Sequence, residues 1–237
     1  MPGECLHPDP WLSRVMERSV YRLDLEDRAA AGRALDRLEG DRRPCFVYCR
    51  LPCQRVADAW WLEGHGFRLV DTTITFAAPL RRGEALVSGL EIRPARPQDR
   101  TQVGDVAASS FRYSRFHADP RIAPELADRI KRRWSENFFS STRGDLMVVA
   151  ADRGRVVGYN LLLCRGEDLV IDLIAVAEAW RGRGVARDLI AFAQDQAPGA
   201  TRLVVGTQLA NRPSLALYQG MGMKLVEAAY VYHLHLP

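Results

Sequence analysis

The sequence lacks long apolar runs. None of its hydrophobic stretches approaches the roughly 18 residues that a membrane-spanning helix requires. The N-terminal stretch MPGECLHPDPW shows neither the basic nor the apolar part of a signal peptide. We therefore expect a cytoplasmic protein with no membrane partner.

Cysteine is scarce as well. The five cysteines are odd in number, and Cys45, Cys49 and Cys53 are spaced by four residues rather than paired as CxxC. This pattern argues against a disulfide framework and against a structural zinc site. We expect free thiols and no bound metal.

A strong charge of one sign is also absent. The 237 residues carry a formal net charge of +4, with a pI near 8.9. No basic stripe alternates with exposed aromatic residues, which argues against a nucleic-acid partner. The mild positive balance suits small anionic ligands, and with 47% hydrophobic residues the chain can bury a sizeable core.

Two common phosphate-binding patterns are missing, GxxxxGK followed by Ser or Thr, and GxGxxG. What is present is AWRGRGVARDLIAFAQ at residues 179–194, where two glycines lie between a strand-like run and a helical pattern. A helix N-terminus offers unpaired N–H groups and the positive end of the helix dipole. Glycine lets the backbone approach a bulky anion. Residues 181–186 are therefore predicted to form a pyrophosphate-binding loop.

A boundary between two units is predicted at PLRRGEALVSGL, residues 79–90, where Pro, Gly and charge replace periodicity. It separates a smaller α/β unit at 1–85 from a larger unit at 90–237. In the larger unit, periodicity and turn signals predict helices at 97–110, 121–139, 185–197 and 211–222, and strands at 145–154, 155–164, 168–176, 201–208 and 223–236. A hairpin turn is expected at Asp152–Gly154, and a helix N-cap at Asn211.

The two units echo each other. Residues 43–76 read as strand, helix, Gly-Phe, strand, and the end of the chain reads as strand, helix, Gly-Met, strand. A constant offset aligns Leu62 with Tyr218 and Gly66 with Gly222. We interpret the first unit as a degenerate copy of half of the second, without an RxxGxG loop and so without the same ligand. The alternative is that any strand–helix–strand unit produces such matches.

The larger unit resembles the GNAT N-acetyltransferases over residues 91–236. The residues that carry the resemblance are Arg181, Gly182, Gly184 and Ala186, followed by Asn211, Ala216, Tyr218 and the pair Gly222–Met223. The family more often has Phe in place of Met223 and often has Gly in place of Ala186. The resemblance implies an α/β (α+β) fold, in which helices flank a mixed, mostly antiparallel twisted sheet with splayed central parallel strands. Here the smaller α/β unit precedes it.

The resemblance also implies that acetyl-CoA is the donor. The residues implied in its binding are Ile174, Ala175 and Val176 for the pantetheine arm, Arg181, Gly182, Arg183, Gly184, Val185 and Ala186 for the pyrophosphate, and Asn211. The acceptor amine would attack the thioester directly, so positioning supplies much of the rate. A backbone N–H at the splayed strands would stabilise the oxyanion.

Two residues are candidates for proton transfer. In this family a tyrosine on the helix after the fifth strand commonly protonates the leaving thiolate, and Tyr218 stands there; the alternative is a core tyrosine. Asp172 is the only carboxylate in LVIDLIAV, and strand alternation places it opposite Ile171 and Leu173. A covered carboxylate must be paired or functional. Asp172 is therefore a base, acting directly or through water, or else the partner of an arginine or a substrate hydroxyl.

The segment SRFHADP is similar to the branch of the family that acts on nucleotide sugars. Arg115 suits a diphosphate, Phe116 suits a thymine or sugar face, and His117 and Asp119 suit sugar hydroxyls or the amine. The alternatives are a core role for Phe116, a helix cap made by Asp119, and an Arg115–Asp119 ion pair.

The closing strand carries His233 and His235 on one face. We expect them to be surface or pocket-rim residues and not a metal site. The exposed face of this strand is a candidate surface for a homodimer.

We therefore expect an acetyl-CoA-dependent N-acetyltransferase for the amino group of a dTDP-type nucleotide-linked deoxysugar. Two alternatives stay open. One is a GNAT enzyme for another small amine or a peptide N-terminus, and the other is a non-catalytic acyl-CoA-binding regulatory domain.

Overall fold

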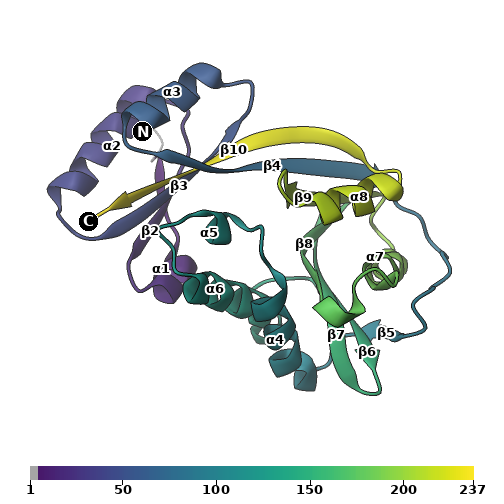
Figure 1. The fold of residues 1–237 in the computed structure, drawn as a ribbon. Helices are drawn as coiled ribbons and strands as arrows, with labels where there is room; N and C mark the ends of the chain where they lie inside the picture. The colour runs from purple at the N-terminus through teal and green to yellow at the C-terminus, as the bar shows by residue number, and fades with distance from the viewer. Residues whose placement is uncertain (1–4) are drawn as a thin grey trace.

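Residues 5–237 are described by a computed structural model, which folds around one ten-stranded mixed sheet (Figure 1). Its strands are β1 (Leu6–Pro8), β2 (Ser19–Leu23), β3 (Cys45–Pro52), β4 (Arg68–Pro79), β5 (Glu91–Pro94), β6 (Leu146–Asp152), β7 (Arg155–Arg165), β8 (Asp168–Val176), β9 (Arg202–Gln208) and β10 (Lys224–Leu236). Its α-helices are α1 (Pro10–Met16), α2 (Arg28–Gly40), α3 (Val56–Gly64), α4 (Arg100–Ser110), α5 (Arg115–Ala118), α6 (Pro124–Glu136), α7 (Val185–Asp195) and α8 (Arg212–Gly220). Short 3-10 helices are η1 (Pro97–Asp99), η2 (Asn137–Ser140) and η3 (Glu178–Trp180).

Local sequence sets the ends of these elements. Asp9, Asp27 and Asn211 precede α1, α2 and α8, and each side chain accepts a hydrogen bond from an amide of the first turn. Between β6 and β7, Arg153 and Gly154 have φ angles of 47° and 81°, the left-handed pair that a tight hairpin turn requires. The predicted N-cap and hairpin are thus confirmed. The predicted helices and strands of the larger unit are present with small shifts at their ends.

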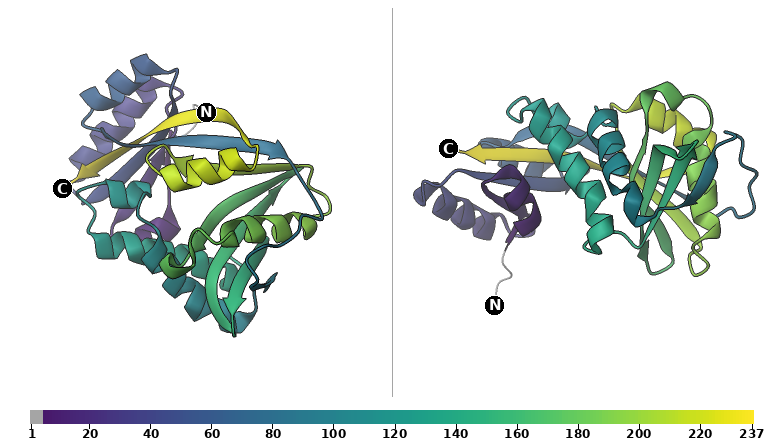
Figure 2. Two further views of the ribbon diagram at one scale, coloured as in Figure 1. Left: turned by 45° about the vertical axis from the view of Figure 1, so that its right-hand side comes forward. Right: turned by 90° about the horizontal axis from the view of Figure 1, so that it is seen from below.

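The helices cover the sheet on both faces (Figures 1 and 2). Helices α2 and α3 pack on the first half of one face and α7 and α8 on its second half, in two separate buried clusters. Helices α1, α5 and α6 pack on the first half of the other face, and α4 packs on its second half. The predicted layered fold is confirmed.

The sheet order is β1-β2-β3-β10-β4-β9-β8-β7-β6-β5, and the strands that flank the β10–β4 pair are arranged symmetrically about it as far as β2 and β8. On each side of this pair lie an antiparallel strand, β3 or β9, and then its parallel partner, β2 or β8. Thr73 lies opposite Ala229 at the centre, and these residues are 156 positions apart. The same offset carries β3, α3 and β4 onto β9, α8 and β10. The half-copy inferred from the sequence is therefore present, and each half places its last strand beside the other.

The segment at residues 80–90 contains no helix or strand, as expected of a boundary. It is nevertheless tied along α7, because the amides of Arg81, Gly83 and Val87 donate hydrogen bonds to side chains of that helix. The sheet also continues across the boundary, since β4 lies between β9 and β10. The units at 1–85 and 90–237 thus share one sheet.

The structure also bears on the expectations for membrane helices, cysteines and the closing strand. No helix in the described part of the chain is long and apolar enough to cross a membrane. All five cysteines are free thiols, as expected. Strand β10 is an interior strand, paired on both edges with β3 and β4, so its edges are closed to strand pairing across a homodimer.

Candidate active site

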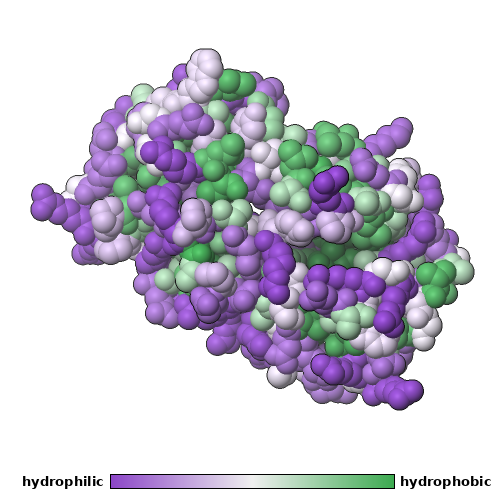
Figure 3. Space-filling view, in the orientation of Figure 1, coloured by the Kyte–Doolittle hydropathy of each residue, from purple (hydrophilic) through white to green (hydrophobic). Residues whose placement is uncertain are grey.

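The central feature of the site is a pair of parallel strands that separate. Strands β8 and β9 pair only as far as Ile171 and Val205, although β8 continues to Val176 and β9 to Gln208. A bulge in β8 lies at the same point, where the β7 register shifts between Leu161 and Leu162. The separated ends open a cleft of about 620 Å³ that is also lined by α7 and α8. Figure 3 shows a hollow with an apolar floor on the front of this half of the molecule.

One end of the cleft is the loop before α7. Gly182 and Gly184 have φ angles of 72° and 81°, a left-handed conformation that favours glycine. Gly184 is the N-cap of α7 and has no side chain to satisfy the first amides of the helix. A Cβ at Gly184 would also lie 2.7 Å from Val87 Cγ2. The loop therefore presents a helix N-terminus that is open to an anion.

The arginine side chains of this loop hold its shape. Arg181 Nε donates to the Val176 carbonyl (3.0 Å), and its Nη2 donates to the Ser110 carbonyl (3.2 Å). The Arg183 guanidinium lies 5.0 Å from the centre of the Trp180 ring. Val185 is buried in the core beneath the loop.

The remaining residues predicted for cofactor binding lie around the same cleft. Ile174, Ala175 and Val176 form the separated end of β8, and Asn211 lines the opposite side. The Asn211 side chain accepts from the Ser214 amide (3.3 Å) and thereby begins α8. The structure thus brings together the loop, the strand end and the N-cap that the sequence singled out.

Tyr218 lines this cleft from α8 and is only 2% exposed. Its ring packs 5.9 Å from the ring of Phe76 in β4, so the first half of the chain helps to position it. Burial raises the pKa of the Tyr218 phenol well above its ordinary value. The phenol is therefore protonated at neutral pH, which is the form a general acid requires.

Asp172 lines the cleft as well, but it is already paired. Arg143 donates to both carboxylate oxygens (2.7 and 2.6 Å), and Trp134 Nε1 donates to one of them (2.9 Å). Of the roles considered from the sequence, these contacts match the one in which Asp172 is the partner of an arginine. The expected alternation holds for Ile171, which packs with α7 on the opposite face, but it is wrong for Leu173, because the bulge leaves Asp172 on the side where Leu173 packs against α4.

Lys131 is a site residue that sequence reasoning missed. It lines the cleft from α6, is only 8% exposed, and its Nζ lies 4.6 Å from the ring centre of Phe111 and 4.9 Å from that of Trp134. Within residues 5–237 it forms no ion pair, and burial lowers its pKa to about 8. The sequence offered one signal for this lysine. Lys131 is one of only two lysines, and it follows Ala127 by four residues, a helical spacing that places it on the same buried face.

The residues predicted for acceptor binding do not all face a cavity. Arg115 lines a second cavity, beside α1. Phe116 is 1% exposed and packs in the core, as its alternative reading held. His117 is bound between Ser114 (2.6 Å) and Asp128 (3.0 Å). These side chains fix the conformation of the loop that carries Arg115.

Asp119 is 1% exposed and does not cap α6, whose N-cap is Ala123. Its Oδ2 lies 2.8 Å from His233 Nδ1 and 2.7 Å from His235 Nε2. His233 is fully buried, so the expectation that it lies at the surface or a pocket rim is wrong. The last strand passes under the acceptor loop, and Asp119 joins the two.

The Asp119–His233–His235 cluster brings three ligand-type atoms within 4.8 Å of one another. Its short distances are those of hydrogen bonds to a single oxygen. Arg115 can only donate, so His233 Nε2 accepts from it (3.5 Å) and His233 Nδ1 donates to Asp119. The arrangement is a hydrogen-bonded relay from Arg115 to Asp119 and needs no metal.

Comparison with known proteins agrees with this geometry. Residues 110–223 match the model of the Acetyltransferase (GNAT) family. The chain is 30% identical over 188 residues to the dTDP-fucosamine acetyltransferase of Escherichia coli O6:H1, covering 78% of this chain and 79% of that protein. The chain belongs to the GNAT acetyltransferase family. Members of this family are acetyltransferases, and this chain is one of them.

Two further similarities extend over more than nine tenths of this chain. It is 25% identical over 244 residues to the spore coat polysaccharide biosynthesis protein SpsD of Bacillus subtilis (strain 168), covering 99% of this chain and 84% of that protein. In fold, it is similar to a tandem GNAT protein from the clavulanic acid biosynthesis pathway. The TM-score is 0.62 at 11% identity, with 92% of this chain and 75% of that chain covered. The likeness to a tandem protein fits the internal symmetry of the sheet.

Proposed function

We propose that this protein transfers the acetyl group of acetyl-CoA to the amino group of a nucleotide-linked amino-deoxysugar. The observation that carries the donor assignment is the cleft between the separated ends of β8 and β9, with the open N-terminus of α7 at its mouth. The acceptor class is supported by the E. coli relative, a dTDP-fucosamine acetyltransferase, and by SpsD, a spore coat polysaccharide biosynthesis protein.

The chain's own groups fit acetyl-CoA. The amides of residues 182–187 and the positive end of the α7 dipole would hold the pyrophosphate. The edge of β8 from Ile174 to Val176, which has no partner on the β9 side, would bind the amide groups of the pantetheine arm as a neighbouring strand would. The donor would then fill the length of this cleft, and the acceptor must enter from elsewhere.

Two buried groups would move the protons. The acceptor amine bonds to the thioester carbonyl carbon, and the carbon–sulfur bond breaks to release a thiol. Tyr218 would donate its phenolic proton to the departing sulfur. Lys131, in its neutral form, would accept the proton that the amine loses. With a pKa of about 8, Lys131 is neutral in a useful fraction of molecules near neutral pH.

Asp172 would act mainly by position. Its two oxygens are engaged by Arg143 and Trp134, which hold it as a rigid wall of the cleft. It also lies close enough to Lys131 to favour the charged form of that lysine. Asp172 would therefore set the balance between charged and neutral Lys131.

Release of free CoA thiol, followed in the presence of defined acceptors, tests the proposal. Purified protein is mixed with acetyl-CoA and a panel of dTDP- and UDP-linked amino sugars, polyamines, amino acids and short peptides, and products are identified by mass spectrometry. The proposal requires acetylated nucleotide amino sugar at the highest kcat/KM. Preference for another amine would support the broader GNAT alternative. CoA binding without transfer to any amine would support the regulatory one.

A further inference from the structure

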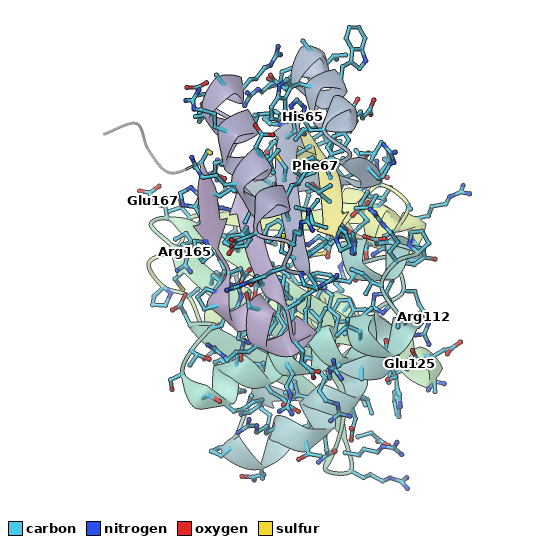
Figure 4. The ribbon with its side chains drawn as sticks, turned by 90° about the vertical axis from the view of Figure 1, so that its left-hand side faces the viewer. His65, Phe67, Arg112, Glu125, Arg165 and Glu167 are labelled. Atoms are coloured by element: carbon cyan, nitrogen blue, oxygen red, sulfur yellow. The ribbon has the colours of Figure 1, made fainter. Side chains whose placement is uncertain are left out.

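A second cavity, distinct from the acetyl-transfer cleft, has a volume of about 950 Å³. We call it the arginine cleft. It lies between α1 and Tyr48 of the first half and α6 and η2 of the second. Figure 4 views the molecule from the side of the first half, with α2 and α3 uppermost near His65 and the second-half helices below, near Glu125. Six arginines line the cleft: Arg14, Arg100, Arg115, Arg129, Arg133 and Arg143.

Half of these arginines have no carboxylate partner. Arg129, Arg133 and Arg143 pair with Glu17, Glu136 and Asp172. Within residues 5–237, by contrast, Arg14, Arg100 and Arg115 form no ion pair. The cleft thus carries more positive than negative side chains. It is suited to a ligand with more than one negative charge.

Arg115 is the most constrained of the unpaired arginines. Its guanidinium carbon lies over two aromatic rings, 3.9 Å from the ring centre of Tyr48 and 4.5 Å from that of Phe116. His233, itself held by Asp119, accepts a hydrogen bond from Arg115 Nη1. Asp9 and Asp71 act on Arg115 from beyond ion-pair distance, so within the described residues this partly buried cation has no directly bonded carboxylate, an arrangement that a bound anion would stabilise. The remaining N–H groups of the fork can donate to two oxygens of a phosphate.

The arginine cleft also offers aromatic surface. Trp11 and Trp134 line it and meet edge to face, with ring centres 5.7 Å apart. Trp11 Nε1 donates to Asn137 Oδ1 (3.2 Å), which fixes the orientation of the indole. Flat indole faces beside arginines suit a nucleobase linked to phosphates.

The two cavities meet at one ion pair. Arg143 lines the arginine cleft and Asp172 lines the acetyl-transfer cleft, and they share two hydrogen bonds. Trp134 lines the arginine cleft and lies beneath Lys131, which lines the acetyl-transfer cleft. A ligand with phosphates at the unpaired arginines can therefore extend a sugar toward Lys131.

We propose that the arginine cleft binds the nucleoside diphosphate part of the acceptor. Arg14, Arg100 and Arg115 contact the phosphates and Trp11 contacts the base. The volume matches that of small-ligand sites. This inference rests on the proposed function for the class of acceptor, and it gives the first half of the chain a role in substrate binding through α1 and Tyr48.

Isothermal titration calorimetry with dTDP and with inorganic pyrophosphate, on the full chain saturated with CoA, tests this site. Arg14→Gln, Arg100→Gln and Arg115→Gln should each raise the Kd for dTDP at least fivefold, and Arg115→Gln should raise it most. Arg33→Gln on α2, outside the cleft, is the matched control and should leave it unchanged. Because Arg14 and Arg100 are exposed, their variants keep the test valid even if Arg115→Gln fails to fold.

Unchanged dTDP binding in all three variants would overturn the site. Equal affinity for pyrophosphate and dTDP would overturn the assignment of a nucleoside. The outcome also separates the two proposals. Acetylation of nucleotide sugars with a KM insensitive to these arginines would remove the site and leave the function. Arginine-dependent dTDP binding without any sugar acetylation would confirm the nucleotide site and overturn the proposed acetyltransferase function.

Discussion

Thr73 in β4 lies opposite Ala229 in β10, and its hydroxyl donates a hydrogen bond to the Ala229 carbonyl (3.3 Å). The pair marks the point about which the two halves of the sheet are related. The two strands that meet there, β4 and β10, are exchanged between the halves. Strand β4 belongs to the first half yet completes the sheet of the second, and β10 does the converse.

The larger unit should therefore not fold on its own. A chain of residues 90–237 lacks β3 and β4, which leaves both edges of β10 and one edge of β9 unpaired and removes Phe76 from beside Tyr218. We expect aggregation or a non-cooperative thermal transition, measured by circular dichroism against the full chain. If residues 90–237 alone unfolded cooperatively and still bound CoA, the strands of the first half would not be required for folding.

Tyr218→Phe should lower kcat at least tenfold with little change in the Kd for acetyl-CoA. The substitution removes the acidic proton but keeps the ring that packs on Phe76. Steady-state kinetics and calorimetry provide the two readouts, with Tyr230→Phe in β10, which packs against the core of the first half, as the control. A kcat within twofold of the wild-type value would mean that another group protonates the thiolate.

Gly184→Ala should weaken acetyl-CoA binding more than Gly182→Ala. Both positions have left-handed backbone, which costs an ordinary residue roughly 1–2 kcal/mol. A Cβ at Gly184 would also meet Val87 Cγ2 at 2.7 Å, whereas the space around Gly182 is open. Adding Val87→Ala to Gly184→Ala should recover part of the loss, as measured by acetyl-CoA titration and thermal unfolding. No recovery would show that backbone strain alone governs the loop.

Lys131→Met should stabilise the fold while abolishing turnover. Burial lowers the pKa of Lys131 from 10.5 to about 8. The unfolded chain therefore binds more protons between pH 8 and 10.5, stability rises with pH across that window, and the penalty is complete below pH 8. Removing the charge should add roughly 3 kcal/mol to the free energy of unfolding at pH 7. Denaturant unfolding measures this change.

The proposed proton transfer at Lys131 has its own readout. In the wild type, kcat/KM should rise with pH through an apparent pKa near 8. Lys131→Arg keeps a cation but cannot lose a proton, so it should stay inactive across that range. If Lys131→Arg retained the wild-type profile, the lysine would be a fixed charge rather than a base.

His233 should make the protein sensitive to acid. Burial lowers its pKa from 6.5 to about 4, so the unfolded chain binds more protons between these values, and stability is lost as pH falls through that window. His233→Asn can still donate to Asp119 but does not titrate, so it should flatten the fall in the free energy of unfolding from pH 6.5 to 4. His7→Asn, at a histidine whose side chain is 42% exposed, serves as the control.

The sequence predicted the second half of the fold well, because its periodicity, its Asn211 cap and its Asp152–Gly154 turn act over a few residues. The glycine loop was found for the same reason. The placement of Asp172 on the same side as Leu173 was not predicted, because the bulge in β8 that interrupts the alternation has no sequence signature. Lys131 and the arginine cleft were missed because their geometry depends on α6, α1 and β3, which only the tertiary fold brings together. Arg115 was predicted from its residue type, but its aromatic support by Tyr48 comes from the other half of the chain.

The helices α2 and α7 occupy matching places in the two halves, but their first turns differ. In α2 the Asp27 carboxylate accepts from the amides of Ala29 and Ala30, whereas in α7 Gly184 offers nothing comparable. The partial positive charge at an uncapped helix N-terminus is stabilised by a bound anion, and in α2 the carboxylate of Asp27 already provides that anion. Although the chain has two related halves, it should therefore bind only one molecule of acetyl-CoA. Binding of two molecules per chain would show that Asp27 does not prevent the first half from binding acetyl-CoA.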